Sequence, residues 1–260
     1  MGPTTPVTAG TAGAVTVVVA NTGEQSGTYS AVLKVNSVDY KTQDVTLNAG
    51  ESKSVVFQVT EPKAGNYALA AGTATGTLTV TPLPMSVASL NLADVGSGYI
   101  PISAQDMDMD LNSFTADVGL PASDWFGFAN AGSPDTFSFI FGFKAYPLTV
   151  VQQLATDLEI GTAQINPKTF VGDFESGFGS QLTRYEILPS LNSIGDKSIG
   201  LRLYMNESGV NLALDFVYYR IGDTVTFLFV MWMPDTAYKP TTDTLARLLE
   251  SREKQVIASK

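Results

Sequence analysis

Cysteine and histidine are both absent from this 260-residue sequence. Without cysteine, the chain has no disulfide, no thiolate nucleophile and no thiolate metal ligand. Without histidine, it has no imidazole to act as a general base or to bind a metal ion. Any catalysis would have to rest on carboxylates, hydroxyls or lysines, so enzymes that depend on a thiol nucleophile or an imidazole base are excluded.

Basic residues are scarce as well. The sequence has 15 Lys and Arg against 25 Asp and Glu, which gives a formal net charge of −10. A nucleic-acid-binding protein needs a basic face to displace counterions from phosphates, so that class of protein is excluded. The same charge repels anionic surfaces.

Long hydrophobic runs are missing too. No stretch reaches the roughly 18 apolar residues of a membrane helix, and the longest strongly apolar run, Thr224 to Met233, has the length of a strand. The opening residues 1–6, Met-Gly-Pro-Thr-Thr-Pro, read as what is left when a chain is trimmed just after an export signal or lipid anchor. We therefore expect an extracellular or cell-surface protein that meets a membrane only through an anchor missing from this sequence.

Composition divides the chain into two halves. The first 84 residues hold 15 Thr but no Arg or Trp, whereas the rest holds 22 of the 26 aromatic residues. The change falls at Pro82-Leu83-Pro84, where two prolines favour an extended connection. We expect two domains, residues 1–84 and residues 85–260.

Short alternating strands dominate the first domain. Val15–Val19, Tyr29–Val35 and Ser54–Val59 have strand patterns, with Gly- and Asn-containing turns between them. Strands repeating at such intervals predict an all-β sandwich.

The turns and strands of this domain also resemble a known family. Val17–Glu24, Gly27–Tyr29 and Leu33–Asn36 are similar to a CARDB-type immunoglobulin-like domain, and the later segments Leu47–Ser52, Val55–Phe57 and Gly65–Tyr67 follow the same pattern in order. The resemblance covers about residues 7 to 81. It implies a spacer or adhesive module of a surface or secreted protein, with no catalytic residues.

Helical and strand patterns alternate in the second domain. Four strands are expected near its end, at Tyr185–Leu188, Ser198–Met205, Asn211–Arg220 and Thr224–Met233, followed by a last helix through Val256. Sequential hairpins require an antiparallel sheet, and helices must cover its apolar face. The sequence predicts an α+β domain, in which a helix over Thr149–Leu158 turns four residues inward: Val150, Val151, Leu154 and Leu158.

The layout of this domain resembles PsbP-like and bacterial lipoprotein domains. The resemblance rests on Ser193–Ser198, the turn Tyr219–Asp223, the apolar strand after it and the final helix, over about residues 90 to 256. It implies a non-enzymatic accessory or ligand-binding protein outside the cytoplasm.

Acidic residues could form two kinds of site. Asp106, Asp108, Asp110 and Asp117 fall at positions 1, 3, 5 and 12 of a calcium-loop pattern, but Leu111 stands where that loop needs glycine. The same segment also fits a helix that begins at Ser103 and has one apolar face, so calcium is an alternative only. Asp173 and Glu175 could act as the paired carboxylates of a glycoside hydrolase, although acidic residues on a helix surface are far commoner.

Aromatic residues are the candidates for ligand binding. A ligand-binding set would comprise Tyr99, Trp125, Phe126, Trp232 and Tyr238. Tyr99, Trp125 and Tyr238 are expected to be partly exposed because each lies near Gly, Pro or another loop residue. The alternatives are a filled core or a pocket for an apolar or lipid-like molecule.

The function expected from the sequence is therefore non-catalytic. The β-sandwich would act as a spacer or adhesion module, and the α+β domain would bind a ligand, a protein or a cell-envelope partner, with no cofactor. A carrier of an apolar or lipid-like ligand is the first alternative, and an Asp/Glu-dependent hydrolase the second.

Overall fold

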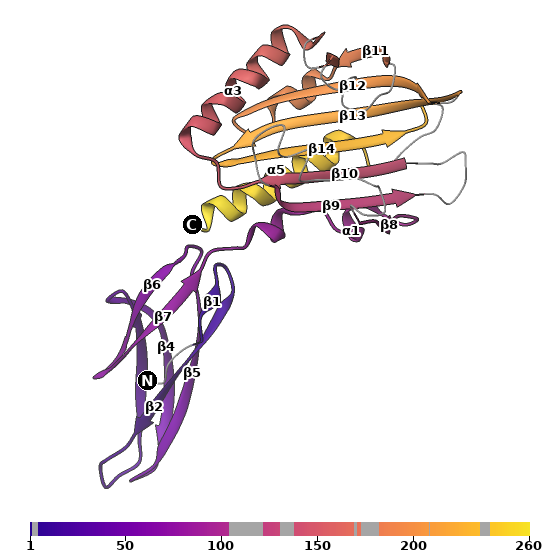
Figure 1. The fold of residues 1–260 in the computed structure, drawn as a ribbon. Coiled ribbons are helices and arrows are strands. Elements are labelled where there is room, and N and C mark those ends of the chain that lie inside the picture. Colours follow the sequence, from indigo (N-terminus) through magenta and orange to yellow (C-terminus); the bar gives the residue numbers. More distant parts are fainter. Residues whose placement is uncertain are drawn as a thin grey trace. The chain divides into compact units, whose positions relative to one another are not determined.

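The computed structural model describes residues 1, 5–103, 122–130, 138–168, 171–172, 182–207, 209–234 and 240–260 (Figure 1). The fold is rich in β-structure, with several sheets and a few helices. The chain divides into two compact units. Unit 1 comprises Met1–Pro84 and Gln255–Lys260, and unit 2 comprises Met85–Lys254. No helix in the described ranges combines the length and apolar character needed to cross a bilayer.

Seven strands build unit 1, in two sheets. A five-stranded sheet has the order β1-β7-β6-β3-β4, and a two-stranded sheet pairs β2 with β5. The strands are β1 (Val7–Thr8), β2 (Ala12–Ala20), β3 (Gly27–Val35), β4 (Val38–Leu47), β5 (Ser52–Thr60), β6 (Gly65–Ala71) and β7 (Ala74–Thr81).

Alternation along the strands explains how the two sheets share one core. In β2 the buried positions Val15 and Val17 alternate with exposed ones, and in β5 Phe57 and Val59 do the same. These side chains pack with Leu33, Leu69 and Leu78 of the larger sheet in a single cluster. The outward positions of β5 are mostly polar, whereas those of β2 are mostly alanine and valine, so burial rather than composition distinguishes the two faces of β2.

A seven-stranded antiparallel sheet forms the centre of unit 2. Its order is β11-β12-β13-β14-β10-β9-β8. The strands are β8 (Ile100–Pro101), β9 (Ala122–Asn130), β10 (Ser138–Ala145), β11 (Leu182–Ile187), β12 (Lys197–Glu207), β13 (Val210–Ile221) and β14 (Thr224–Trp232). The helical segments are η1 (Met85–Ala88), α1 (Leu92–Val95), α3 (Val150–Ile165), η4 (Pro189–Ser193) and α5 (Thr242–Ala258).

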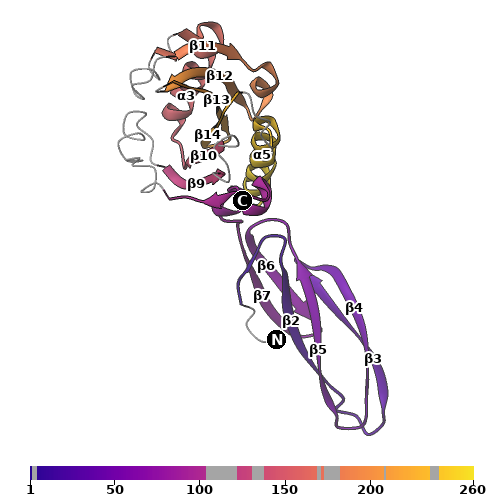
Figure 2. The ribbon, with the colours of Figure 1, turned by 90° about the vertical axis from the view of Figure 1, so that its right-hand side faces the viewer.

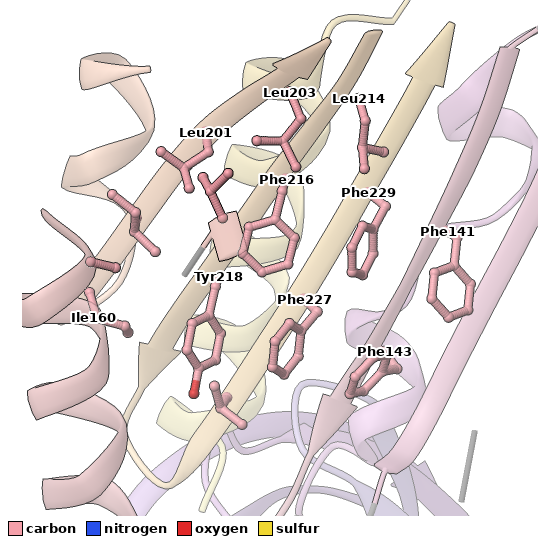
Figure 3. Packing of buried hydrophobic residues seen from close by; sticks show 14 of the residues in the cluster. Phe141, Phe143, Ile160, Leu201, Leu203, Leu214, Phe216, Tyr218, Phe227 and Phe229 are labelled. Atoms are coloured by element: carbon pink, nitrogen blue, oxygen red, sulfur yellow. The ribbon is translucent and has the colours of Figure 1, made fainter. Parts of the chain in front are cut away.

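The two faces of this sheet contact different helices. On one face, Leu214, Phe216 and Tyr218 of β13 pack in one cluster with Ile160 of α3. On the other face, Thr226 donates a hydrogen bond to Glu253 of α5, and Asp215 accepts one from Thr242. Figure 2 shows α3 and α5 on opposite sides of the strands, and Figure 3 shows the aromatic face from close by, with Ile160 of α3 at its border.

Aromatic rings fill the face that α3 borders. Phe143 stacks on Phe227 with centroids 4.7 Å apart, and Phe227 stacks on Tyr218 at 4.3 Å. Phe216 lies 4.9 Å from Phe229, which lies 5.7 Å from Phe141 (Figure 3). The rings therefore contact one another across three neighbouring strands, as they do in a packed core.

Gly142 of β10 lets the strands beside it approach closely. A Cβ atom at this position would lie 2.6 Å from the carbonyl oxygen of Phe227 and 2.5 Å from the ring of Phe126. We expect Gly142→Ala to lower the free energy of unfolding of unit 2 by about 1–3 kcal/mol, because a backbone oxygen cannot move aside as a side chain can. Urea unfolding measures the loss. Gly161→Ala is the control, since its Cβ would meet nothing within 4 Å, and an equal loss at both positions would contradict this explanation.

The strands and the last helix lie close to where the sequence places them, and the predicted antiparallel sheet is present. The helix predicted at 149–158 is found but extends to Ile165. Its orientation differs from the prediction, and this difference leads to the candidate site.

Candidate functional site: the outward face of helix α3

Helix α3 begins at a well-formed N-cap. Gln152 donates its backbone N–H to the hydroxyl of Thr149, and the Gln152 side-chain oxygen accepts the Thr149 N–H at 2.9 Å. This reciprocal pair is a capping box with Gln in the third position, and it fixes where the helix starts.

The inward face of α3 is narrow and only partly apolar. Its buried residues are Thr156, Ile160 and Ala163, spaced four and three residues apart. Gln164 adds a hydrogen bond of 2.6 Å from its side chain to the carbonyl oxygen of Ser198. The side chains through which α3 contacts β12 and β13 are therefore small or polar, apart from the one large aliphatic residue Ile160.

Two acidic residues fix the rotation of the helix about its axis. Asp157 accepts two hydrogen bonds from the guanidinium of Arg220, at 2.6 and 3.0 Å. Glu159 accepts one from the hydroxyl of Tyr218 at 3.0 Å. These bonds pull both flanks of α3 toward β13, and a bidentate Arg–carboxylate pair is strongly directional.

The electrostatics of these contacts agree with the geometry. The hydrogen bond that Arg220 donates to Asp157 raises the pKa of Arg220, and Asp196 accepts a further hydrogen bond from this guanidinium at 3.1 Å. Burial, and then the charge of Glu159, raise the pKa of Tyr218. Both donors therefore keep their protons, and the helix stays attached in this rotation at ordinary pH.

The opposite face of α3 is an exposed apolar stripe. Its five large aliphatic side chains are between 65% and 88% exposed, and we call them the α3 stripe: Val150, Val151, Leu154, Leu158 and Ile165. The sequence-based expectation that Val150, Val151, Leu154 and Leu158 point inward is wrong. Apolar periodicity identified the helix but not its buried side, because ion pairs rather than apolar burial set the rotation.

The aromatic residues proposed as a ligand site do not lie together. Trp125 packs on the aromatic face, with its ring 5.8 Å from Phe141. Phe126 and Trp232 lie on the face that α5 covers, where Lys144 approaches the Phe126 ring at 5.2 Å and Arg202 approaches the Trp232 ring at 4.8 Å. The sheet separates Trp125 from the other two.

Tyr99 is buried rather than partly exposed, with 7% of its surface accessible. The Tyr99 hydroxyl forms a hydrogen bond with the Ser138 hydroxyl at 2.7 Å, so the one polar group of the side chain has a partner inside the protein. Trp125 is half-buried. Tyr238, the acidic residues Asp106, Asp108, Asp110 and Asp117, and the pair Asp173 and Glu175 all lie outside the described residues.

A buried charged cluster that the sequence did not reveal lies under α5. Lys144 and Glu253 have no exposed surface, and Glu253 accepts a hydrogen bond of 2.7 Å from Thr226. Burial lowers the pKa of Lys144, and burial raises the pKa of Glu253 to about 7. Nearby, Arg252 forms two 2.7 Å hydrogen bonds with Asp94. Solvent cannot reach Lys144 or Glu253, so these groups belong to the interior beneath α5 and do not face a substrate.

In the described part of the chain, no three acidic side chains come together in an arrangement that could hold a metal ion. The surface feature with the clearest chemical character is therefore the α3 stripe, which offers apolar contact.

Comparison with known proteins assigns no family to the chain. Neither the models of known protein families nor the curated protein sequences give a match.

Proposed function

We propose that this protein is a non-catalytic, exported or cell-surface binding protein. In this proposal unit 1 is an immunoglobulin-like β-sandwich of the CARDB type that serves as a spacer. Unit 2 is an α+β domain that presents a partner-binding surface, and the α3 stripe is that surface.

The exposure of the α3 stripe is the observation that carries the proposal. Five large aliphatic side chains gather on one side of a 16-residue helix, and each is at least 65% exposed. Scattered exposed apolar residues are normal on protein surfaces, but contiguous apolar patches mark sites of interaction. The helix itself is attached by Arg220 and Tyr218, so the stripe is not needed to hold it in place.

The interior of unit 2 supports a non-catalytic function. The titratable pair with the strongest burial, Lys144 and Glu253, is enclosed beneath α5. The aromatic rings contact one another at centroid distances of 4.3 to 6.4 Å. Both features are typical of a structural core, and they favour the surface of unit 2 over its interior as the place of binding.

Hydrogen bonds in the turns of unit 1 support its proposed role as a spacer. The side chain of Asn21 donates to the carbonyl oxygens of Gln25 and Asn48, at 2.7 and 3.1 Å, and so ties two turns together. The Glu51 carboxylate accepts the Asn48 N–H at 2.7 Å. Asn21, Asn48 and Glu51 belong to the pattern that resembles CARDB domains, so here these residues serve folding.

Serine substitutions in the stripe test this proposal. Leu154→Ser and Leu158→Ser should shift the unfolding transition of unit 2 by only a degree or two, because surface changes lie within about 0.5 kcal/mol. Ile160→Ser, on the buried side of the same helix, should cost several kcal/mol. Fluorescence of an apolar dye should fall in the stripe variants. If Leu158→Ser proved as destabilising as Ile160→Ser, the stripe would be core and the proposed surface would not exist.

A further inference from the structure

The α3 stripe has a spacing that suits another helix. Four residues of the stripe, Val151, Leu154, Leu158 and Ile165, together with Gly161 on the same face, are separated by three, four, three and four residues. This is the heptad spacing of a helix–helix seam, in which apolar residues recur on average every 3.5 residues. The stripe is therefore shaped to receive a helix along its whole length, about 24 Å.

Charge does not oppose a second copy of the same helix. None of the stripe residues is ionisable, and the two acidic residues of α3, Asp157 and Glu159, turn toward Arg220 and Tyr218 of their own sheet. Asp157 and Glu159 flank Leu158, but the charge of Asp157 is paired with Arg220, so the stripes themselves bring only apolar side chains together although the whole chain carries a net charge of −10.

Size complementarity favours an antiparallel arrangement. A Cβ atom on Gly161 would meet nothing within 4 Å, so the helix has an open notch at this position. When two copies run antiparallel with Leu158 near the two-fold axis, Leu154 of each copy faces the Gly161 notch of the other. A parallel pair would place notch against notch, and it would also align the two helix dipoles unfavourably.

The area is sufficient for a weak specific contact. Five aliphatic side chains contribute roughly 100 Å² of apolar surface each, or about 500 Å² per copy. Two copies would bury about 1,000 Å², which is the lower end of specific interfaces. A two-fold contact of this kind uses the same patch twice and closes at two subunits.

We propose that the partner of the α3 stripe is a second copy of this chain, which forms an antiparallel two-fold dimer through α3. This inference rests on the proposed function, since it names the occupant of the proposed binding surface. A membrane surface is disfavoured because α3 carries no basic residue.

Sedimentation velocity of the full chain tests the dimer. The wild-type protein should pass from its monomer mass of 27.6 kDa to twice that mass as its concentration rises from about 1 µM to a few hundred µM, the range expected for a small interface. Leu158→Glu should remain monomeric over the whole range. Val38→Glu, at a comparably exposed valine of unit 1, should behave as wild type. A wild-type protein that stays monomeric throughout would overturn the dimer.

Disulfide trapping tests the arrangement, and the absence of native cysteine makes it unambiguous. Leu158→Cys should cross-link to its own copy under mild oxidation, because the two side chains meet at the axis. Val151→Cys should not, because its two copies would lie about 21 Å apart. Cross-linking of Val151→Cys with none at Leu158→Cys would refute the antiparallel arrangement.

Thiol labelling separates the failure of this inference from the failure of the proposed function. If Leu158→Cys is monomeric and reacts quickly with a maleimide, the stripe is open, so the dimer fails while a different partner remains. If it is monomeric and protected, the stripe is covered within its own chain, and both proposals fail. If the wild-type monomer binds to neutral phosphatidylcholine vesicles, the partner of the stripe is a lipid surface and the dimer proposal fails.

Discussion

Phe216→Ala is expected to destabilise unit 2 by about 3–5 kcal/mol, the loss typical of a fully buried phenylalanine. Phe216 is 1% exposed, and its ring lies within 6.3 Å of the rings of Tyr218, Phe227 and Phe229. Removing it leaves a cavity at the centre of the aromatic face, and rings held on three strands cannot collapse fully into that space. The loss is a large part of the stability of an ordinary domain.

Tryptophan fluorescence measures this loss in unit 2 alone. Both tryptophans of the chain, Trp125 and Trp232, belong to unit 2, so excitation near their absorption maximum reports the urea unfolding of that unit. Phe139→Ala is the matched control, because Phe139 stacks on Phe141 but is only partly buried. A loss below about 1 kcal/mol for Phe216→Ala would mean that the aromatic face is loosely filled, and an apolar ligand would again become the better explanation of these rings.

Glu253 is expected to make the stability of unit 2 fall as pH rises from about 4.5 to 7. Burial raises the pKa of Glu253 from 4.5 to about 7 in the folded protein. The unfolded chain thus releases this proton at lower pH than the folded one, so the stabilising effect of protonation is complete below pH 4.5 and is lost as pH passes 7. Glu253→Gln should abolish that decline, which is about 3 kcal/mol.

Lys144→Met should enlarge the fall in the stability of unit 2 with rising pH. The positive charge of Lys144 lowers the pKa of Glu253 and so favours its ionised form. In Lys144→Met this charge is lost, and the ionised form of Glu253 becomes less stable in the folded protein. We expect a loss of about 1–3 kcal/mol at pH 8, where the buried carboxylate is ionised, and a smaller loss at pH 5, where Glu253 is protonated. Urea unfolding at several pH values measures both variants. Lys254→Met is the control, since the Lys254 side chain is 60% exposed and its pair with Glu250 should contribute only about 1 kcal/mol or less. An unchanged pH profile in Glu253→Gln would show that another group titrates in this range.

The strands were predictable from the sequence because their signals are local. Asn211–Arg220 and Thr224–Met233 are apolar runs on either side of a Gly-Asp turn, and the structure has β13 and β14 there. A hairpin needs only its own turn and two neighbouring strands. The antiparallel sheet followed from the same local reasoning.

The candidate site was not predictable in the same way, because it depends on partners far apart in the sequence. Arg220 is 63 residues from Asp157, and nothing local links the two residues. Yet their bond turns Leu154 and Leu158 outward. Lys144 and Glu253 were missed for a similar reason. Charged residues are rarely buried unless they are paired, and the pairing arises only when α5 packs on the sheet.

The ends of the large sheet bear on how copies of this protein can associate. In the described part of the chain the sheet ends at β8 and β11. The first is two residues long and contains Pro101, which has no amide hydrogen to offer a further strand. The second carries the exposed ion pair of Arg184 and Glu186. Short, proline-bearing or charged borders deter strand-to-strand growth. Open-ended polymerisation into fibrils is therefore disfavoured at both described borders of this sheet, and the outward face of α3 offers a contact that does not use a sheet edge.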